Sequence, residues 1–189
     1  MDIQSFIATC QDFIQHPHAQ DLCYQFMSDA MTNLPAFQQS LGALRPQERP
    51  EDAFLFRSPN LFIFNLLLIP NLISPPHTHG TWAVIGLYEG QEDNIFYRRN
   101  NGNLEETGRK CLTPGEVVLL TPDTIHAVSN PSPKPSLALH VYGADLFSTP
   151  RSMWNPWTLE ESPFEINQFL TYSLTMMQQD NASDMKHPT

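Results

Sequence analysis

The sequence predicts a mainly β protein, an antiparallel sandwich or small barrel of short strands with helices at both ends. Three observations predict it: helical apolar spacing over the first forty-odd residues, short apolar runs bounded by turn residues from about residue 54, and helical spacing again near residues 164–177. The 189 residues suit a single domain, with a helical region 1–50, a barrel 54–150 and an extended or helical tail 151–189.

The N-terminal helices are predicted from apolar residues three and four positions apart. Two cysteines fall at apolar positions of this pattern, which favours buried structural thiols, and Cys111 stands apart from both. The positions that form the two apolar faces are Ile3, Phe6, Ile7, Cys10, Phe13 and Ile14, then Leu22, Cys23, Phe26, Met27 and Ala30. A break at His16-Pro17-His18 separates the two helices.

The strands are predicted from runs rich in Phe, Ile, Leu, Val and Tyr. These runs alternate with clusters of Pro, Asn, Gly and Asp, and Asn100-Asn101-Gly102-Asn103 is a clear turn signal. In chain order the runs are FLF, LFIFNLLLI, TWAVIGLY, NIFYRR, EVVLL, HAVSN and SLALHVYG.

Charge and hydropathy argue against a nucleic-acid-binding or membrane-spanning protein. The net charge is −10 with only 10 Lys and Arg residues, whereas nucleic-acid binding normally needs clustered cations. The longest apolar stretch, residues 61–69, contains Asn65 and is too short to span a bilayer. Asp2 and Gln4 stand where a signal peptide would carry basic residues. We expect a cytoplasmic protein, a monomer or homodimer, with neither nucleic acid nor membrane as a partner.

Three histidines at strand ends form a candidate metal site. His77 and His79 are one residue apart, so on a strand both side chains point to the same face. His126 precedes another apolar strand, and a barrel would bring the two regions together. Three neutral imidazoles suit iron(II), zinc, nickel or copper and leave coordination positions open. Taken singly, each histidine also fits a surface or hydrogen-bonded core position. His16 and His18 flank a proline at a helix junction, which predicts no ligand role.

These residues resemble the two motifs of the cupins, a family of double-stranded β-helix (jelly-roll) barrels. His77, His79 and Gly90 match the first motif, in which Asn71 replaces the leading glycine and Ala83, beside Val84, replaces the acidic ligand. The second motif is matched by Gly115, His126 and Asn130, with Asp123 in place of its inner glycine. The resemblance implies a cupin barrel with a three-histidine metal site.

Among cupins, a three-histidine site without the acidic ligand resembles that of the thiol dioxygenases. This group includes cysteine dioxygenase and the bacterial 3-mercaptopropionate dioxygenases. Three stretches carry this resemblance, which covers roughly residues 57–151: SPPHTHGTWAVIGLYEGQE, TPGEVVLLTPDTIHAVSN and SLALHVYGADL. It implies an iron(II) enzyme that oxidises a small thiol carboxylate with O2 to a sulfinate, with nickel or zinc as alternative metals in isolated protein.

That family places a Ser-His-Tyr relay beside the iron. Here His140 and Tyr142 match the last two members, and Ala138 stands in the serine position, so Ser136 or another donor would have to replace it. Alternatively, His140 and Tyr142 are core residues of the barrel with no catalytic role, and their polar atoms then need only hydrogen-bond partners. Animal-type members crosslink a cysteine to the tyrosine, but the region near Val84 has none, which predicts an uncrosslinked Tyr142.

A substrate carboxylate needs a cationic partner, because an unpaired buried carboxylate is costly. By resemblance, Arg57 and Arg151 are both candidates, and each also fits a plain surface position. Trp82, three residues after His79, is a candidate core or pocket-wall residue. Two other functions remain open from sequence: a three-histidine cupin with other metal chemistry, such as a dioxygenase that cleaves C–C bonds of diketones, and a metal- or ligand-binding cupin without turnover.

Overall fold

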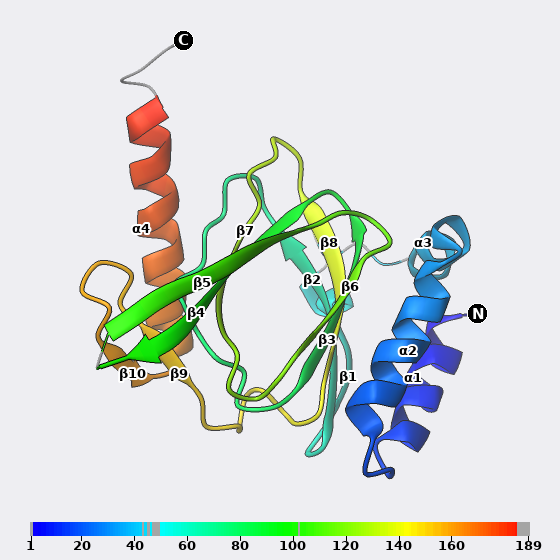
Figure 1. Ribbon diagram of the computed structural model, residues 1–189. Coiled ribbons are helices and arrows are strands. Elements are labelled where there is room, and N and C mark those ends of the chain that lie inside the picture. The colour runs from blue at the N-terminus through cyan, green and yellow to red at the C-terminus, as the bar shows by residue number, and fades with distance from the viewer. Residues whose placement is uncertain (1, 43, 45, 47–49, 102, 185–189) are drawn as a thin grey trace.

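The computed structural model describes residues 2–42, 44, 46, 50–101 and 103–184. Two facing antiparallel sheets form a barrel, with three N-terminal helices packed outside one wall and a C-terminal helix at the opposite side (Figure 1). The predicted fold class, mainly β with helices at both ends, is confirmed. No helix in the described ranges is long and apolar enough to cross a membrane.

The N-terminal helices are α1 (Ile3–Phe13), α2 (Ala19–Met31) and α3 (Leu34–Leu41), followed by a 3-10 turn, η1 (Pro50–Ala53). The Asp2 side chain caps α1 by accepting a hydrogen bond from the Ser5 N–H, as is typical of an N-cap. Cys10 and Cys23 are buried, as predicted, and Cys111 is exposed. Helix α2 lies close to the sheet at Gly86, where a Cβ atom would lie 2.5 Å from Cε of Met31.

The larger sheet has the strand order β1-β2-β8-β3-β6. Alternation along its strands separates two faces: Leu61 and Ile63 pack towards the helices, whereas Phe62 packs with Tyr142 inside the barrel. The same alternation places Ala138 on the inner face with Tyr142. The strand bounds are β1 (Phe54–Ser58), β2 (Leu61–Leu68), β3 (Ala83–Glu89), β6 (Val117–Leu120) and β8 (Ser136–Tyr142).

The smaller sheet has the order β5-β4-β7, formed by β4 (Glu92–Asn100), β5 (Asn103–Leu112) and β7 (Ile125–Ser129). The turn predicted at residues 100–103 joins β4 and β5, and Gly102 lies outside the described residues. Beyond residue 150, where the strand pattern is lost in the sequence, a short hairpin of β9 (Ser152–Trp154) and β10 (Glu161–Pro163) forms. The last helix, α4 (Ile166–Asp184), begins two residues later than predicted and extends seven residues further.

Candidate metal centre

Backbone pairing brings the two histidine segments together. The N–H of His77 donates to the carbonyl of His126 over 2.9 Å, and the N–H of His126 donates to the carbonyl of His77 over 3.0 Å. The two residues therefore stand directly opposite each other in an antiparallel pair, with their side chains on one face. His79 follows two residues after His77 and points the same way.

The three imidazoles form a compact buried group. One ring nitrogen from each lies within 4.8 Å of the others, and the ring centroids are 4.7 to 5.2 Å apart. Nδ1 of His79 and Nε2 of His126 are buried without a hydrogen-bond partner. Buried polar atoms are normally paired, and a cation bound between the rings would engage the lone pair of Nε2 of His126. The donor set fits a metal ion that accepts imidazole ligands.

Burial keeps these rings neutral, which is the state that binds a metal. The pKa of His77 is lowered to about 4, chiefly by burial; the Pro75 carbonyl opposes this shift and the Arg151 charge adds to it. The pKa values of His79 and His126 lie well below the usual histidine value, first because of burial and then because of the neighbouring rings. A neutral imidazole offers a lone pair on one nitrogen.

Hydrogen bonds orient two of the rings. Nδ1 of His77 lies 3.1 Å from the Pro75 carbonyl, which only accepts, so Nδ1 carries the hydrogen and Nε2 keeps its lone pair. Nδ1 of His126 lies 2.8 Å from Oδ1 of Asn94, with the same consequence. The Asn94 amide in turn donates to Oε1 of Glu92 over 2.9 Å, and both residues are buried on β4.

Replacing Asn94 by alanine should lower the affinity for a divalent metal by about 10- to 100-fold, the usual cost of losing a partner that orients a ligand. The variant frees His126 to rotate and to exchange tautomers. Titration of the metal-free protein with zinc against a competing chelator measures the change. Asn94→Asp, which retains an acceptor at Oδ1, should recover much of the affinity, and equal losses in both variants would contradict the proposed orientation.

Glu92 should make the folding stability depend on pH. Burial raises its pKa from 4.5 to about 7, so the folded chain holds the proton more tightly than the unfolded chain does. The resulting stabilisation is complete below pH 4.5 and is lost as the pH rises through 7, roughly 2 kcal/mol of it between pH 5.5 and 8. Urea unfolding of the metal-free wild type and Glu92→Gln at both values should show this difference, since glutamine does not titrate. Parallel pH dependence of the two proteins would refute it.

The acidic ligand that cupin sites usually carry is absent here. Ala83, at its predicted position, is buried on the inner face of β3 opposite Tyr142, and Val84 points to the helix side. Within the described part of the chain, the group that can hold a metal consists of the three histidines alone. Asn71 adopts φ of 59° where the family motif has glycine, a conformation that asparagine tolerates better than most residues.

His140 and Tyr142 lie beside the imidazoles. The ring of Tyr142 is 5.1 Å from that of His79, and its hydroxyl is 2.7 Å from Nδ1 of His140. Burial lowers the pKa of His140 to about 3 and raises the pKa of the Tyr142 hydroxyl, so both groups are neutral near pH 7. Nε2 of His140 and the Ser136 hydroxyl are both buried without partners, so Ser136 does not replace the serine missing at Ala138.

Arg151 borders the same site. A Cβ atom at Gly80 would lie 3.3 Å from Cβ of Arg151, and the Thr78 N–H donates to the Ser152 carbonyl over 2.9 Å, so the two segments lie side by side. The guanidinium carbon is 3.4 Å from the centroid of the Phe164 ring. Burial lowers the pKa of Arg151 to about 10, and the group remains charged at pH 7.

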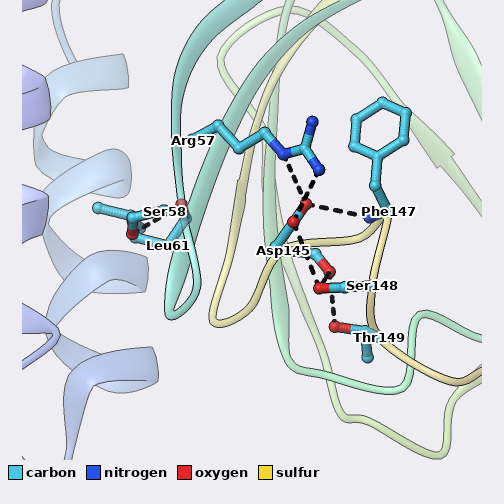
Figure 2. Close-up of polar contacts among 7 residues, drawn as sticks. All are labelled: Arg57, Ser58, Leu61, Asp145, Phe147, Ser148 and Thr149. Carbon is cyan, nitrogen blue, oxygen red and sulfur yellow. Dashed lines mark hydrogen bonds and ion pairs between the residues drawn. The ribbon is translucent and has the colours of Figure 1, made fainter.

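Arg57 is engaged elsewhere. Its Nε and Nη2 donate to the two carboxylate oxygens of Asp145 over 3.0 and 2.9 Å, and its guanidinium carbon lies 4.4 Å from the centroid of the Phe147 ring. Figure 2 shows this pair, with Phe147 beside the guanidinium group. Two of its donors are thus already used, and Arg57 does not line the cavity that His77, His79 and Arg151 share.

Trp82 faces away from the imidazoles. Its indole packs against the cluster on the helix side of the larger sheet, and its carbonyl accepts from the Gly143 N–H over 3.2 Å. A Cβ atom at Gly143 would collide with the indole ring. Of the two places the sequence allows for Trp82, the structure shows the core one.

His77, His79 and Arg151 line one cavity of about 320 Å³. Six of its thirteen lining residues are phenylalanines, which could not be grouped from the sequence because they come from four separate segments. The lining residues are Phe54, Phe62, Phe64, Leu66, His77, His79, Tyr142, Leu146, Phe147, Arg151, Phe164, Ile166 and Phe169. Such a cavity, apolar with a few convergent polar groups, is typical of a small-molecule site.

The barrel has the arrangement of a cupin, since two facing antiparallel sheets carry the histidine pair and the third histidine on adjoining segments. The fold is of the cupin type. No protein-family model matches the chain. Its similarity to solved structures is low and concerns the fold alone.

Three of these solved structures illustrate the similarity. A DMSP lyase from Ruegeria pomeroyi is 20% identical over 52% of this chain and 45% of its own, with a TM-score of 0.41. Oxalate decarboxylase from Bacillus subtilis is 16% identical over 60% and 25%, at 0.41, and a cupin superfamily protein from Desulfitobacterium hafniense is 14% identical over 49% and 74%, at 0.40. The chain spans less than half the length of the first two.

Proposed function

We propose that this protein is a mononuclear iron(II) thiol dioxygenase that converts a small thiol carboxylate and O2 into a sulfinate. The observation that carries the proposal is the convergence of three kinds of group on one cavity: a neutral three-imidazole metal site, the Tyr142 hydroxyl and the Arg151 guanidinium. In the proposed reaction, the metal site binds the thiolate, Arg151 binds the carboxylate, and Tyr142 donates a hydrogen bond to the reacting centre. A purely binding cupin without turnover would have no need of a half-buried cation in the cavity that His77 and His79 line.

The metal site suits an anionic sulfur ligand. His77, His79 and His126 are neutral ligands, so a divalent ion held by them keeps its full positive charge and favours a thiolate. Iron(II) bound there would supply open positions for thiolate and O2 and the redox chemistry between them. In the balanced reaction both oxygen atoms of O2 bond to the sulfur, the sulfur loses four electrons, O2 gains them, and the thiol proton is released.

Arg151 orients the substrate. Its guanidinium offers a planar set of donors that matches a carboxylate, and stacking on Phe164 limits its freedom. A carboxylate held there places the rest of the molecule inside the cavity that His77, His79 and Tyr142 also line. Holding the reacting atom in place in this way removes part of the entropic cost of the reaction.

Tyr142 supplies a hydrogen-bond donor to the reacting centre. Nε2 of His140 is buried without a partner, and an unpaired lone pair is less costly there than an unpaired N–H. We therefore assign the hydrogen of His140 to Nδ1, which donates to the Tyr142 oxygen. The hydroxyl hydrogen of Tyr142 is then free to point into the cavity, where it stabilises negative charge on oxygen or sulfur.

The test is O2 consumption by protein reconstituted with one iron(II) per chain. Cysteine, 3-mercaptopropionate, cysteamine and a diketone are offered in parallel, and the product is identified by mass spectrometry. Uptake of one O2 per thiol, with a sulfinate product, is expected for a thiol carboxylate but not for cysteamine, which lacks a carboxylate. Uptake with the diketone alone, or none with any thiol, would overturn the proposal.

A further inference from the structure

The cavity selects against an amino group. Its lining includes one cation, Arg151, and no carboxylate among the described residues. The nearby Asp145 is paired with Arg57, and Glu165 caps α4 by accepting from the backbone N–H groups of Asn167 and Gln168 over 3.1 and 2.7 Å. An ammonium group carried into this cavity would lose water without gaining a partner, which is costly.

The cavity also has more apolar wall than a three-carbon thiol acid can cover. Pockets of about 300–1,000 Å³ hold drug-sized ligands, and this one measures about 320 Å³. Its polar groups gather around the imidazoles, whereas the rest of the wall is almost entirely aromatic or aliphatic. Apolar surface that stays hydrated contributes nothing to binding, so a ligand with an apolar body gains affinity that a small acid cannot.

The apolar lining of the cavity continues to its solvent-exposed rim, which includes Phe54, Phe147 and Ile166. Phe54, Phe147 and Ile166 line the cavity and remain 52%, 61% and 50% exposed. Phe147 is fixed at the rim, because its backbone N–H donates to Asp145 over 3.1 Å and its ring lies against Arg57 (Figure 2). A wall held in place at the entrance is available to contact whatever body the substrate carries.

Resting on the proposed thiol chemistry, we propose that the substrate is a thiol carboxylate with an aromatic or branched apolar body and no ammonium group. Arg151 holds its carboxylate, the sulfur faces the three imidazoles, and the apolar body fills the phenylalanine-lined part of the cavity. The phenylalanine wall and the absence of an acidic partner thus determine specificity.

Ligand binding to the full-length, metal-free protein tests the ligand class without any turnover. Calorimetric titration compares 3-phenylpropanoate with propanoate, which lacks the apolar body, with phenylalanine, which adds an ammonium group, and with 3-phenylpropan-1-ol, which lacks the charge. We expect 3-phenylpropanoate to bind at least about tenfold more tightly than each of the others. Equal affinity for propanoate or phenylalanine would overturn the proposal.

A matched pair of variants on α4 locates the contact. Ile166 and Leu174 are almost equally exposed, at 50% and 51%, but only Ile166 lines the cavity. Ile166→Ser should weaken 3-phenylpropanoate binding by about threefold or more, and Leu174→Ser should leave it unchanged. Equal effects of both substitutions would mean that the acid binds elsewhere.

Turnover by the iron-loaded protein separates this proposal from the proposed function. With 2-benzyl-3-mercaptopropanoate, kcat/KM should exceed that with 3-mercaptopropionate and with cysteine by at least tenfold. If small thiols are oxidised without any preference for the benzyl compound, the proposed dioxygenase activity stands and the proposed apolar substrate class is overturned. If 3-phenylpropanoate binds selectively but no thiol is oxidised, the proposed ligand class stands and the proposed thiol oxidation is overturned.

Discussion

Replacing His79 by alanine is expected to abolish metal binding and, with it, any metal-dependent activity. The ring of His79 is buried, and its centroid lies 5.2 Å from that of His77 and 5.0 Å from that of His126. Loss of a partner that only orients a ligand costs about 10- to 100-fold in metal affinity, and loss of the ligand itself should exceed that range. Metal content after dialysis against iron(II) or zinc should fall from one ion per chain to near zero.

The chain provides its own control for this experiment. His18 belongs to the other His-x-His pair, and its side chain is 80% exposed beside Asp21. His18→Ala should retain the full metal content, since an exposed histidine next to a single carboxylate is not a site. Thermal unfolding of both metal-free variants checks that His79→Ala still folds. Full metal occupancy in folded His79→Ala would show that the three imidazoles do not form the site.

The metal centre follows from the sequence to a large degree because its ligands obey strand geometry. Residues two apart on an extended segment share a face, which fixes the relation of His77 to His79 and of His140 to Tyr142 without any knowledge of the fold. The third histidine, His126, needs the barrel, and here the resemblance to a known pair of motifs supplied what periodicity alone does not. The backbone pairing of His77 with His126 agrees with it.

The environment of the centre could not be predicted in this way. Glu92 and Asn94 lie two apart on β4 and share a face, but nothing local shows that this face is buried and meets His126, 32 residues further along. The same holds for Arg57, whose partner Asp145 is 88 residues away. A strand pattern tells which side chains share a face, whereas the neighbour of that face depends on long-range packing.

The hairpin of β9 and β10 was also missed, for a different reason. Each strand has three residues, which is too short for alternation to be recognised, and β10 ends in proline. Tertiary contacts hold it instead: Met153 pairs with His77, and the Trp154 N–H donates to the Pro76 carbonyl over 2.9 Å. This attachment brings Arg151 to the cavity.

Replacing Arg151 by glutamine should lower kcat/KM for a thiol carboxylate by roughly 30-fold or more. Truncating one partner of a buried charged pair costs about 2–5 kcal/mol, and every 1.4 kcal/mol is a factor of ten. The carboxylate is bound both before and during the reaction, so most of the loss should appear as a higher KM. Steady-state O2 consumption at varied substrate concentration separates the two parameters.

Two comparisons make this result specific to the guanidinium group. Arg57→Gln removes the half-exposed arginine that pairs with Asp145 and does not line the cavity, and it should change kcat/KM less than about fivefold. A thiol without a carboxylate should react equally poorly with wild type and with Arg151→Gln, because neither protein can use the missing group. If Arg57→Gln instead caused the larger loss, the carboxylate would be bound at the rim, and the orientation of the substrate in the cavity would have to be reversed.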